Sequence, residues 1–228
     1  MINLYQEVVS VSTKYPSLSI SKTEDGYILK GILVMNKTYD EVPLYHEFNI
    51  EIQVPNAFPN QIPKVFAAKE DIPVGFQHFL VDGELCLGAM CELRTFLTHT
   101  PSLTAFIDEL LMSYLYAAEY YRTYGIAPYG ERSHGIKGTR EAYKERYRTD
   151  DDHLLNTLLL FLSGYKKYRG HCSCPCGSGQ KFRDCHGTQL IQDIRSPYYE
   201  EFKEDAINLL CTYYENIKKR QERRKWIV

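Results

Sequence analysis

The sequence predicts an α+β fold, in which a four-stranded antiparallel meander with flanking helices precedes a helical region that carries a cysteine-rich knuckle. Two observations carry this prediction. Residues 17–68 contain short runs of strand-like alternation separated by turns, whereas from residue 100 onward apolar residues recur at helical spacing. The 228 residues suffice for one well-buried domain and a smaller appendage. We therefore expect a first domain over residues 1–148 and a second over residues 149–228.

The first 68 residues contain one expected helix and four expected strands. Residues 2–15 have a rough apolar face that includes Leu4 and Val8, which predicts a short helix. Strands are expected at 17–23, 27–35, 46–54 and 64–68, with a turn at Asp25-Gly26. The third strand alternates strongly, and one of its faces carries Phe48, Ile50, Ile52 and Val54. Short links between sequential antiparallel strands predict a meander.

Helices are expected to dominate the rest of the chain. Residues 69–100 show no regular pattern, and Thr100-Pro101 then resembles an N-cap followed by proline at the first helical position. The helix that follows runs to about residue 118. Residues 125–138 are rich in glycine and predict an ordered loop, and residues 139–148 predict a charged helix. Two later helices are expected, one after the aspartates at 150–152 and one from about residue 196 to a basic tail at 218–225.

Residues 174–187 are the most informative stretch of the chain. They read Cys-Pro-Cys-Gly-Ser-Gly-Gln-Lys-Phe-Arg-Asp-Cys-His-Gly and contain two tight pairs of metal-ligating side chains around a turn. Zinc favours four thiolate or imidazole ligands in a tetrahedron, and glycines allow the backbone to fold back so that both pairs converge. We expect a structural zinc site, with a metal-free redox cluster or a catalytic zinc as alternatives. The expected ligands are Cys174, Cys176, Cys185 and His186.

This stretch resembles the SEC-C motif, the short zinc motif at the C-terminus of the bacterial preprotein translocase motor. That motif reads Cys-x-Cys-Gly-Ser-Gly-x-Lys-x-x-x-Cys-His, and residues 174–186 fit it throughout. The resemblance implies a zinc-stabilised knuckle over residues 172–187 that docks on a protein partner or on the rest of its own chain. His171 and Cys172 lie just upstream and are spare candidates that the motif does not need.

Composition and charge narrow the functional classes. The net charge is −2, which gives no reason to expect strong nucleic-acid binding by the chain as a whole. The most apolar stretch, residues 154–162, is interrupted by Asn156 and Thr157 and is too short to span a bilayer. The N-terminus lacks a basic start followed by an apolar run. With seven cysteines, four of them spaced as metal ligands, we expect a cytoplasmic protein that has no membrane partner.

Residues 2–124 resemble the ubiquitin-conjugating enzymes in the order of their elements and in several motifs. Residues 55–65 read Pro-Asn-Ala-Phe-Pro-Asn-Gln-Ile-Pro-Lys-Val, similar to that family's aromatic-proline pair and its proline-lysine-valine entry to the fourth strand. His78, followed by Gly83-Glu84-Leu85-Cys86-Leu87, is similar to its histidine and its glycine-x-isoleucine-cysteine-leucine stretch. Residues 100–104 are similar to the start of its next helix.

The resemblance implies that Cys86 accepts a ubiquitin-like modifier from an activating enzyme as a thioester and passes it to an amine. A thiolate is a strong nucleophile and a thioester is easily aminolysed, so cysteine suits both steps. The chain departs from the family at Leu80, where the family has an asparagine that stabilises the oxyanion. His78 is one candidate replacement. The loop 129–135, which contains His134, is another source of polar groups.

Two other functions compete with the transferase. A non-catalytic relative of the same fold would act as a protein-binding adaptor, and the missing asparagine favours this alternative. A cysteine hydrolase would use Cys86 with His134 as its base and needs the two side chains within hydrogen-bond reach. Cys91 is a weaker candidate nucleophile, and Cys211 is expected in the core.

Overall fold

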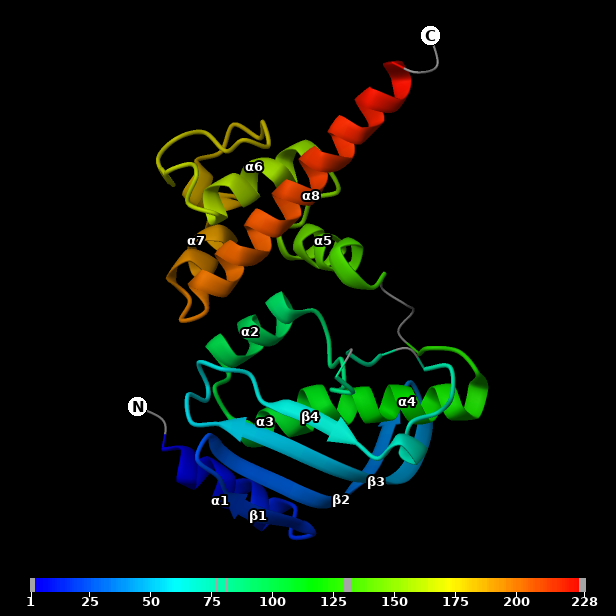
Figure 1. Cartoon of the computed structure of the whole chain (residues 1–228). Coiled ribbons are helices and arrows are strands. Elements are labelled where there is room, and N and C mark those ends of the chain that lie inside the picture. Colours follow the sequence, from blue (N-terminus) through cyan, green and yellow to red (C-terminus); the bar gives the residue numbers. More distant parts are fainter. Residues whose placement is uncertain (1–2, 77, 81, 129–132, 226–228) are drawn as a thin grey trace. The chain divides into compact units, whose positions relative to one another are not determined.

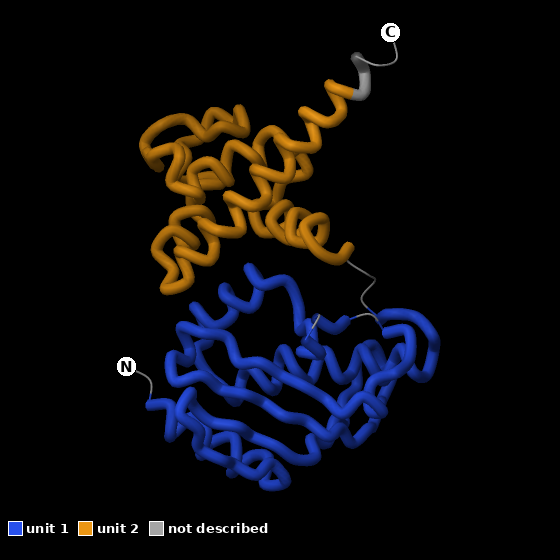
Figure 2. Tube along the Cα trace, in the orientation of Figure 1, with its two compact units in different colours: residues 1–131 blue, residues 132–228 orange. Residues whose placement is uncertain are grey.

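The computed structural model describes residues 3–76, 78–80, 82–128 and 133–225. The chain divides into two compact units, residues 1–131 and residues 132–228 (Figure 2). The first unit contains the sheet, and the second contains helices and the cysteine-rich knuckle. This division precedes the boundary that we expected after residue 148. It assigns helix α5, Gly135–Arg146, to the second unit.

The first unit is the predicted α+β arrangement of one sheet with flanking helices (Figure 1). Its helix α4 contacts β2 and β3, so the sheet and this helix share a core. The π-helical segment η2 continues directly into α4. The elements of the unit, in order, are α1 (Leu4–Lys14), β1 (Leu18–Lys22), β2 (Gly26–Tyr39), β3 (Val42–Pro55), β4 (Lys64–Ala67), η1 (Lys69–Asp71), α2 (Met90–His99), α3 (Leu103–Ala105), η2 (Phe106–Leu111) and α4 (Met112–Tyr124).

The sheet has the order β1-β2-β3-β4 with every neighbouring pair antiparallel, which confirms the predicted four-stranded meander. Alternation along β3 buries its apolar side chains on one face, and their cross-strand partners on β2 are buried with them. Leu33, for example, lies opposite Phe48, and both are fully buried. Burial of an aliphatic or aromatic side chain contributes about 1.5–3 kcal/mol relative to exposure, so this face supplies much of the unit's stability.

The hairpin between β2 and β3 is longer than the sequence predicted. The two strands pair from Gly26–Pro55 as far as Tyr39–Val42, and only Asp40 and Glu41 form the turn. Both turn residues have positive φ, 45° and 64°, as a two-residue turn that matches the strand twist requires. Glycine or asparagine usually occupies such positions, so the Asp-Glu pair carried no clear turn signal.

Two helical predictions for residues 90–105 are corrected. Residues 90–99, expected to be irregular, form the helix α2. Ala89 is its N-cap residue, and the Ala89 amide donates to the Glu92 carboxylate at 3.1 Å. The next helix begins at Leu103 rather than at Pro101, and Ser102 is its N-cap, because the amide of Ala105 donates to Ser102 Oγ at 3.4 Å. Thr100 instead ends α2. Thr100 and Ser102 are both polar residues that can cap a helix N-terminus, and in the folded chain Ser102 takes this role.

The second unit consists of helices joined by the knuckle. Helix α8 (Tyr199–Lys225) contacts α5, α6 (Asp152–Leu162) and α7 (Gly187–Arg195), so it is the common partner of the other α-helices described in this unit. The sequence did not predict α7, a helix of only nine residues between the ligand His186 and the turn at Ser196. The elements after α5 are α6 (Asp152–Leu162), η3 (Phe182–Asp184), α7 (Gly187–Arg195) and α8 (Tyr199–Lys225).

A buried polar cluster connects α5 with α7. Asp193 on α7 is 1% exposed and pairs with Arg146 on α5, whose Nε lies 2.9 Å from Asp193 Oδ2. The Tyr147 hydroxyl donates to the same oxygen at 2.8 Å, and the Arg146 guanidinium also covers the ring of Phe202. Burial, and then the nearby Asp193 charge, raise the pKa of Tyr147 well above its usual value. These contacts explain why α5 belongs to the second unit.

The expectation that Cys211 lies in the core is wrong. Phe202, Ala206 and Leu209 are buried, whereas Cys211 is exposed and does not lie in the core. Position 211 is about 200° around the helix from position 209, at about 100° per residue, so it leaves the apolar stripe. Across the described part of the chain, none of the helices combines the length and the hydropathy needed to cross a bilayer.

Candidate functional site

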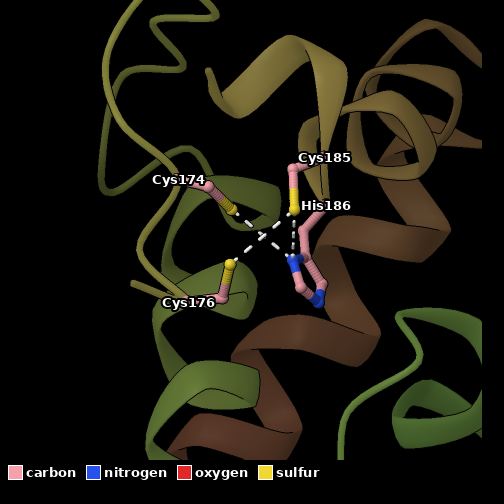
Figure 3. Close-up of side chains that lie close together, drawn as sticks. All are labelled: Cys174, Cys176, Cys185 and His186. Atoms are coloured by element: carbon pink, nitrogen blue, oxygen red, sulfur yellow. Dashed lines mark hydrogen bonds between the residues drawn. The ribbon is translucent and has the colours of Figure 1, made fainter. Parts of the chain in front are cut away.

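Four side chains of the second unit converge as the sequence predicted (Figure 3). The ligand atoms of Cys174, Cys176, Cys185 and His186 all lie within 4.8 Å of one another. Nδ1 of His186 lies 3.4 Å from Sγ of Cys174 and 3.2 Å from Sγ of Cys185. The sulfurs of Cys176 and Cys185 are 3.7 Å apart. Three sulfurs and one imidazole nitrogen thus surround a single point.

These separations fit a tetrahedral zinc ion. With Zn–S bonds of about 2.3 Å and Zn–N bonds of about 2.0–2.1 Å, tetrahedral geometry requires S···S edges of about 3.8 Å and S···N edges of about 3.5 Å. The S···S separation of 3.7 Å and the S···N separations of 3.2 and 3.4 Å lie close to these values. The donor set fills all four positions, as in structural zinc sites, whereas catalytic sites keep one position open.

A small hairpin presents the first ligand pair. The amide of Cys174 donates to the carbonyl of Gln180 at 2.8 Å, and Ser173 bridges Lys181 in antiparallel fashion. Between them, Gly177 and Gly179 have φ values of +77° and +75°, which side chains with a Cβ rarely adopt. These two positions let the chain reverse within a few residues, as the glycines in the sequence predicted.

The second ligand pair lies between η3 and α7. The amide of Cys185 donates to the carbonyl of Phe182 at 3.2 Å, and His186 is the N-cap residue of α7. Phe182 is buried, with the rings of Phe161 and Tyr168 each 5.1 Å from its own. Packing of this one ring therefore sets the position of the ligand pair relative to α6.

Local electrostatics distinguish the ligand thiols. Burial raises the pKa of Cys174 to about 11, whereas the hydroxyl of Ser178, 3.2 Å from Sγ of Cys176, lowers the pKa of that thiol to about 6. Metal binding requires every cysteine ligand as a thiolate. A bound Zn²⁺ would supply the charge that keeps Cys174 deprotonated, and its role at this closed site would be to hold the hairpin against α7.

We predict that Gly187→Ala destabilises the knuckle. A Cβ at this position would lie 2.4 Å from the carbonyl oxygen of Phe182 and 2.9 Å from its ring. In an open helix the same change would stabilise by up to about 1 kcal/mol. Here the backbone must shift, and overpacking costs typically about 1–3 kcal/mol. Urea unfolding of the second unit measures the effect, with the exposed Gln192→Ala on the same helix as control. Equal stability of the two variants would contradict the prediction.

The upstream candidates do not join the metal cluster. Cys172 and His171 are exposed, and the group of four ligand atoms that lie within 4.8 Å of one another contains neither of them.

Cys86 lies in the first unit, on a small hairpin beside β4. The amide of Cys86 donates to the carbonyl of His78 at 2.9 Å, and Phe79 bridges Leu85. The amide of Leu85 donates to the carbonyl of Val65 on β4 at 2.8 Å. Leu85 is buried, whereas Cys86 is half-buried, with its Sγ 3.9 Å from the carbonyl oxygen of Gly88. The structure thus brings His78 and Cys86 together on paired backbone segments.

Tyr114 is a residue near Cys86 that the sequence analysis did not select. Its hydroxyl, on α4, donates to the carbonyl of His78 at 3.0 Å. Burial raises the pKa of Tyr114, and the nearby Cys86 raises it further. The His78 ring lies 4.6 Å from that of Phe76. Tyr114 lies within the helix that the sequence predicted after residue 101, but the spacing of residues does not show where its hydroxyl points.

The remaining candidates lie elsewhere. His134 is the N-cap residue of α5 in the second unit, so it belongs to a different unit from Cys86. Residues 129–132 of the loop that we expected to supply polar groups lie outside the described residues. Cys91 is 1% exposed on α2, so it is not positioned as a nucleophile.

Comparisons with known proteins support only the knuckle. Residues 173–188 match the family model of the SEC-C motif, in agreement with the resemblance noted in the sequence and with the cluster of four ligands. Neither the curated proteins nor the solved structures returned a match to the chain. The resemblance of the first unit to ubiquitin-conjugating enzymes therefore stays a prediction, and the second unit carries a stretch similar to the SEC-C motif.

Proposed function

We propose that the chain is a carrier of a ubiquitin-like modifier, with Cys86 as the residue that holds the modifier as a thioester. The observation that carries this proposal is a half-buried cysteine on a hairpin beside the fourth strand of an antiparallel meander. Two motifs that resemble those of ubiquitin-conjugating enzymes, residues 55–65 and 100–104, precede and follow Cys86 in the sequence. The role requires a sulfur that an incoming carbonyl can reach, because transfer begins with attack of the thiolate on that carbonyl.

The proposed chemistry consists of two exchanges at one carbonyl carbon. The Cys86 thiolate attacks the thioester that joins the modifier to its activating enzyme, and the cysteine thiolate of that enzyme leaves. An amine nitrogen then attacks the new thioester. The bond to Cys86 breaks, its thiolate leaves, and the nitrogen loses a proton. The activating enzyme supplies the energy from ATP, so Cys86 needs no oxidant or metal.

Tyr114 and His78 support this chemistry as candidate donors near the sulfur. The family's asparagine is replaced by Leu80, and a developing oxyanion needs a hydrogen-bond donor. The Tyr114 hydroxyl donates to the His78 carbonyl, which is also the acceptor of the Cys86 amide, and it would have to exchange that acceptor for the oxyanion in order to act as the donor.

The adaptor remains the second candidate function, and Leu80 is the observation that favours it. The Cys-His hydrolase ranks below both, since the sequence offers no clear third residue to orient His134 as a base. In each of these functions the knuckle serves as a zinc-stabilised docking module for a partner. Thiolate ligands and a thioester carrier both need reduced cysteines, and we infer a cytoplasmic location on that ground.

Reconstitution tests the carrier. The full chain is mixed with ATP and with an activating enzyme and a ubiquitin-like protein encoded beside it. We expect an adduct that dithiothreitol removes, that is lost in Cys86→Ala and that persists in Cys91→Ala, since Cys91 is buried. Peptide mapping after brief N-ethylmaleimide treatment should label Cys86 faster than Cys91. Slow labelling of Cys86 together with no adduct would favour the adaptor.

A further inference from the structure

The net charge of −2 conceals a separation of charge between the two units. The first unit has 8 Lys and Arg against 16 Asp and Glu, a net charge of −8. The second has 19 Lys and Arg against 13 Asp and Glu, a net charge of +6. Such asymmetry between parts of a chain is typical of proteins in which one part binds a polyanion.

Five exposed cations lie on the segment that leads into and out of the hairpin, residues 165–183, which we call the knuckle loop, and the basic tail at 218–225 carries the other large group of cations in the unit. Its C-terminal end runs beside residues 170–172, because the amide of Arg183 donates to the carbonyl of Gly170 at 3.0 Å and the amide of Phe182 donates to that of Cys172 at 2.7 Å. Between residues 163 and 189 the sequence has a single carboxylate, Asp184. The exposed cations of the knuckle loop are Lys166, Lys167, Arg169, Lys181 and Arg183.

An aromatic ring accompanies these cations. Tyr165 is 83% exposed, at the start of the knuckle loop and directly before Lys166 and Lys167. A tyrosine ring usually packs against apolar neighbours, and the nearby Tyr168 does so on Phe182. Tyr165 therefore offers a free face for stacking beside positive charge.

The composition of the knuckle loop distinguishes three kinds of negatively charged partner, namely a membrane surface, an acidic protein and a nucleic acid. A membrane-surface element needs an apolar face to insert, and a protein interface needs an apolar core. In the knuckle loop the one large apolar side chain besides the tyrosines is Phe182, and it is buried. Single-stranded nucleic acid needs neither, since its phosphates bind cations and its bases stack on aromatic rings.

We propose that the knuckle loop binds single-stranded nucleic acid, with Lys166, Lys167 and their neighbours on the phosphates and Tyr165 under a base. This inference goes beyond the proposed carrier and names the class of partner for the docking module. It depends on the metal-stabilised loop and not on the chemistry of Cys86. A Cys86→Ala variant should bind as the parent does, so a failed carrier leaves the proposal standing.

The test is fluorescence anisotropy of a labelled 20-nucleotide poly-U RNA, titrated with the full zinc-loaded chain from 50 to 200 mM NaCl. Replacing both lysines, Lys166→Gln with Lys167→Gln, should weaken binding severalfold and lower the slope of log K against log salt by about 1.4, or about 0.7 for each lost phosphate contact. Tyr165→Ala should weaken binding at least about fivefold and leave the slope unchanged, because stacking releases no counterions.

A matched control separates this site from general charge. Lys137→Gln with Lys203→Gln removes the same charge from one exposed and one half-buried position of the same unit, outside the knuckle loop, and should change binding little. Equal losses in the two double variants, or no saturable binding at 50 mM NaCl, would overturn the proposal. So would binding to vesicles of anionic phosphatidylglycerol or to polyglutamate that poly-U does not compete away, since those results would assign the loop to a lipid or to an acidic protein.

Discussion

We expect Cys185→Ser to release zinc from the chain and to unfold the second unit around the knuckle. Cys185 contributes one of the three sulfurs, and its Sγ lies 3.2 Å from Nδ1 of His186 and 3.7 Å from Sγ of Cys176. Structural zinc contributes about 10–16 kcal/mol in small zinc-binding peptides at neutral pH, and a hydroxyl is a poor replacement for a thiolate. Little else holds the hairpin, whose residues from 175 to 181 are almost all exposed.

Metal analysis after dialysis, together with thermal unfolding followed by circular dichroism, measures this effect. The parent should hold one zinc per chain, and Cys185→Ser close to none. Cys172→Ser is the matched control, since Cys172 is exposed and outside the cluster. It should keep the metal and the melting temperature. The first unit should unfold alike in all three proteins, because its core contains none of these residues. Stoichiometric zinc in Cys185→Ser, or none in the reduced parent, would refute the metal site.

The second large effect is expected from Asp193→Ala. The substitution leaves the Arg146 guanidinium buried, with 10% of its side chain exposed, and removes the acceptor of the Tyr147 hydroxyl. Removing one partner of a buried ion pair typically costs about 3–5 kcal/mol, because the remaining charge has lost its compensation. Since these contacts connect α5 with α7, the loss should appear as a lower urea midpoint for the second unit.

Glu200→Ala is the control for this prediction. Glu200 pairs with Lys203 at 3.0 Å, but 75% of the Glu200 side chain is exposed. An exposed pair contributes about 0–1 kcal/mol, so the midpoint should move little. If both variants lost the same small amount, the cluster around Asp193 would not hold the helices together. Far-UV circular dichroism before unfolding checks that each variant has folded.

The sheet and the ligand set could be predicted because their signals are local. The alternation of apolar and polar residues from 46 to 54 predicts which face of β3 is buried. The four ligands lie within 13 consecutive residues, so hairpin geometry alone brings most of them together. The turn at Asp40-Glu41 and helix α2 were missed for the converse reason. The turn depends on the pairing of two long strands, and the helix depends on the burial of side chains such as Leu97. A short stretch of sequence contains no information about either.

The sequence by itself determined the α+β class, the meander order and the identity of the four candidate metal ligands, because each depends on residue types at short spacing. The tertiary structure alone decided that Tyr114 reaches the carbonyl beside Cys86 and that Asp193 is buried with Arg146. It also brought Arg169 and Arg183 to neighbouring strands of one loop. These pairings join residues 14 to 47 positions apart, and only packing of the intervening chain sets which side chains meet.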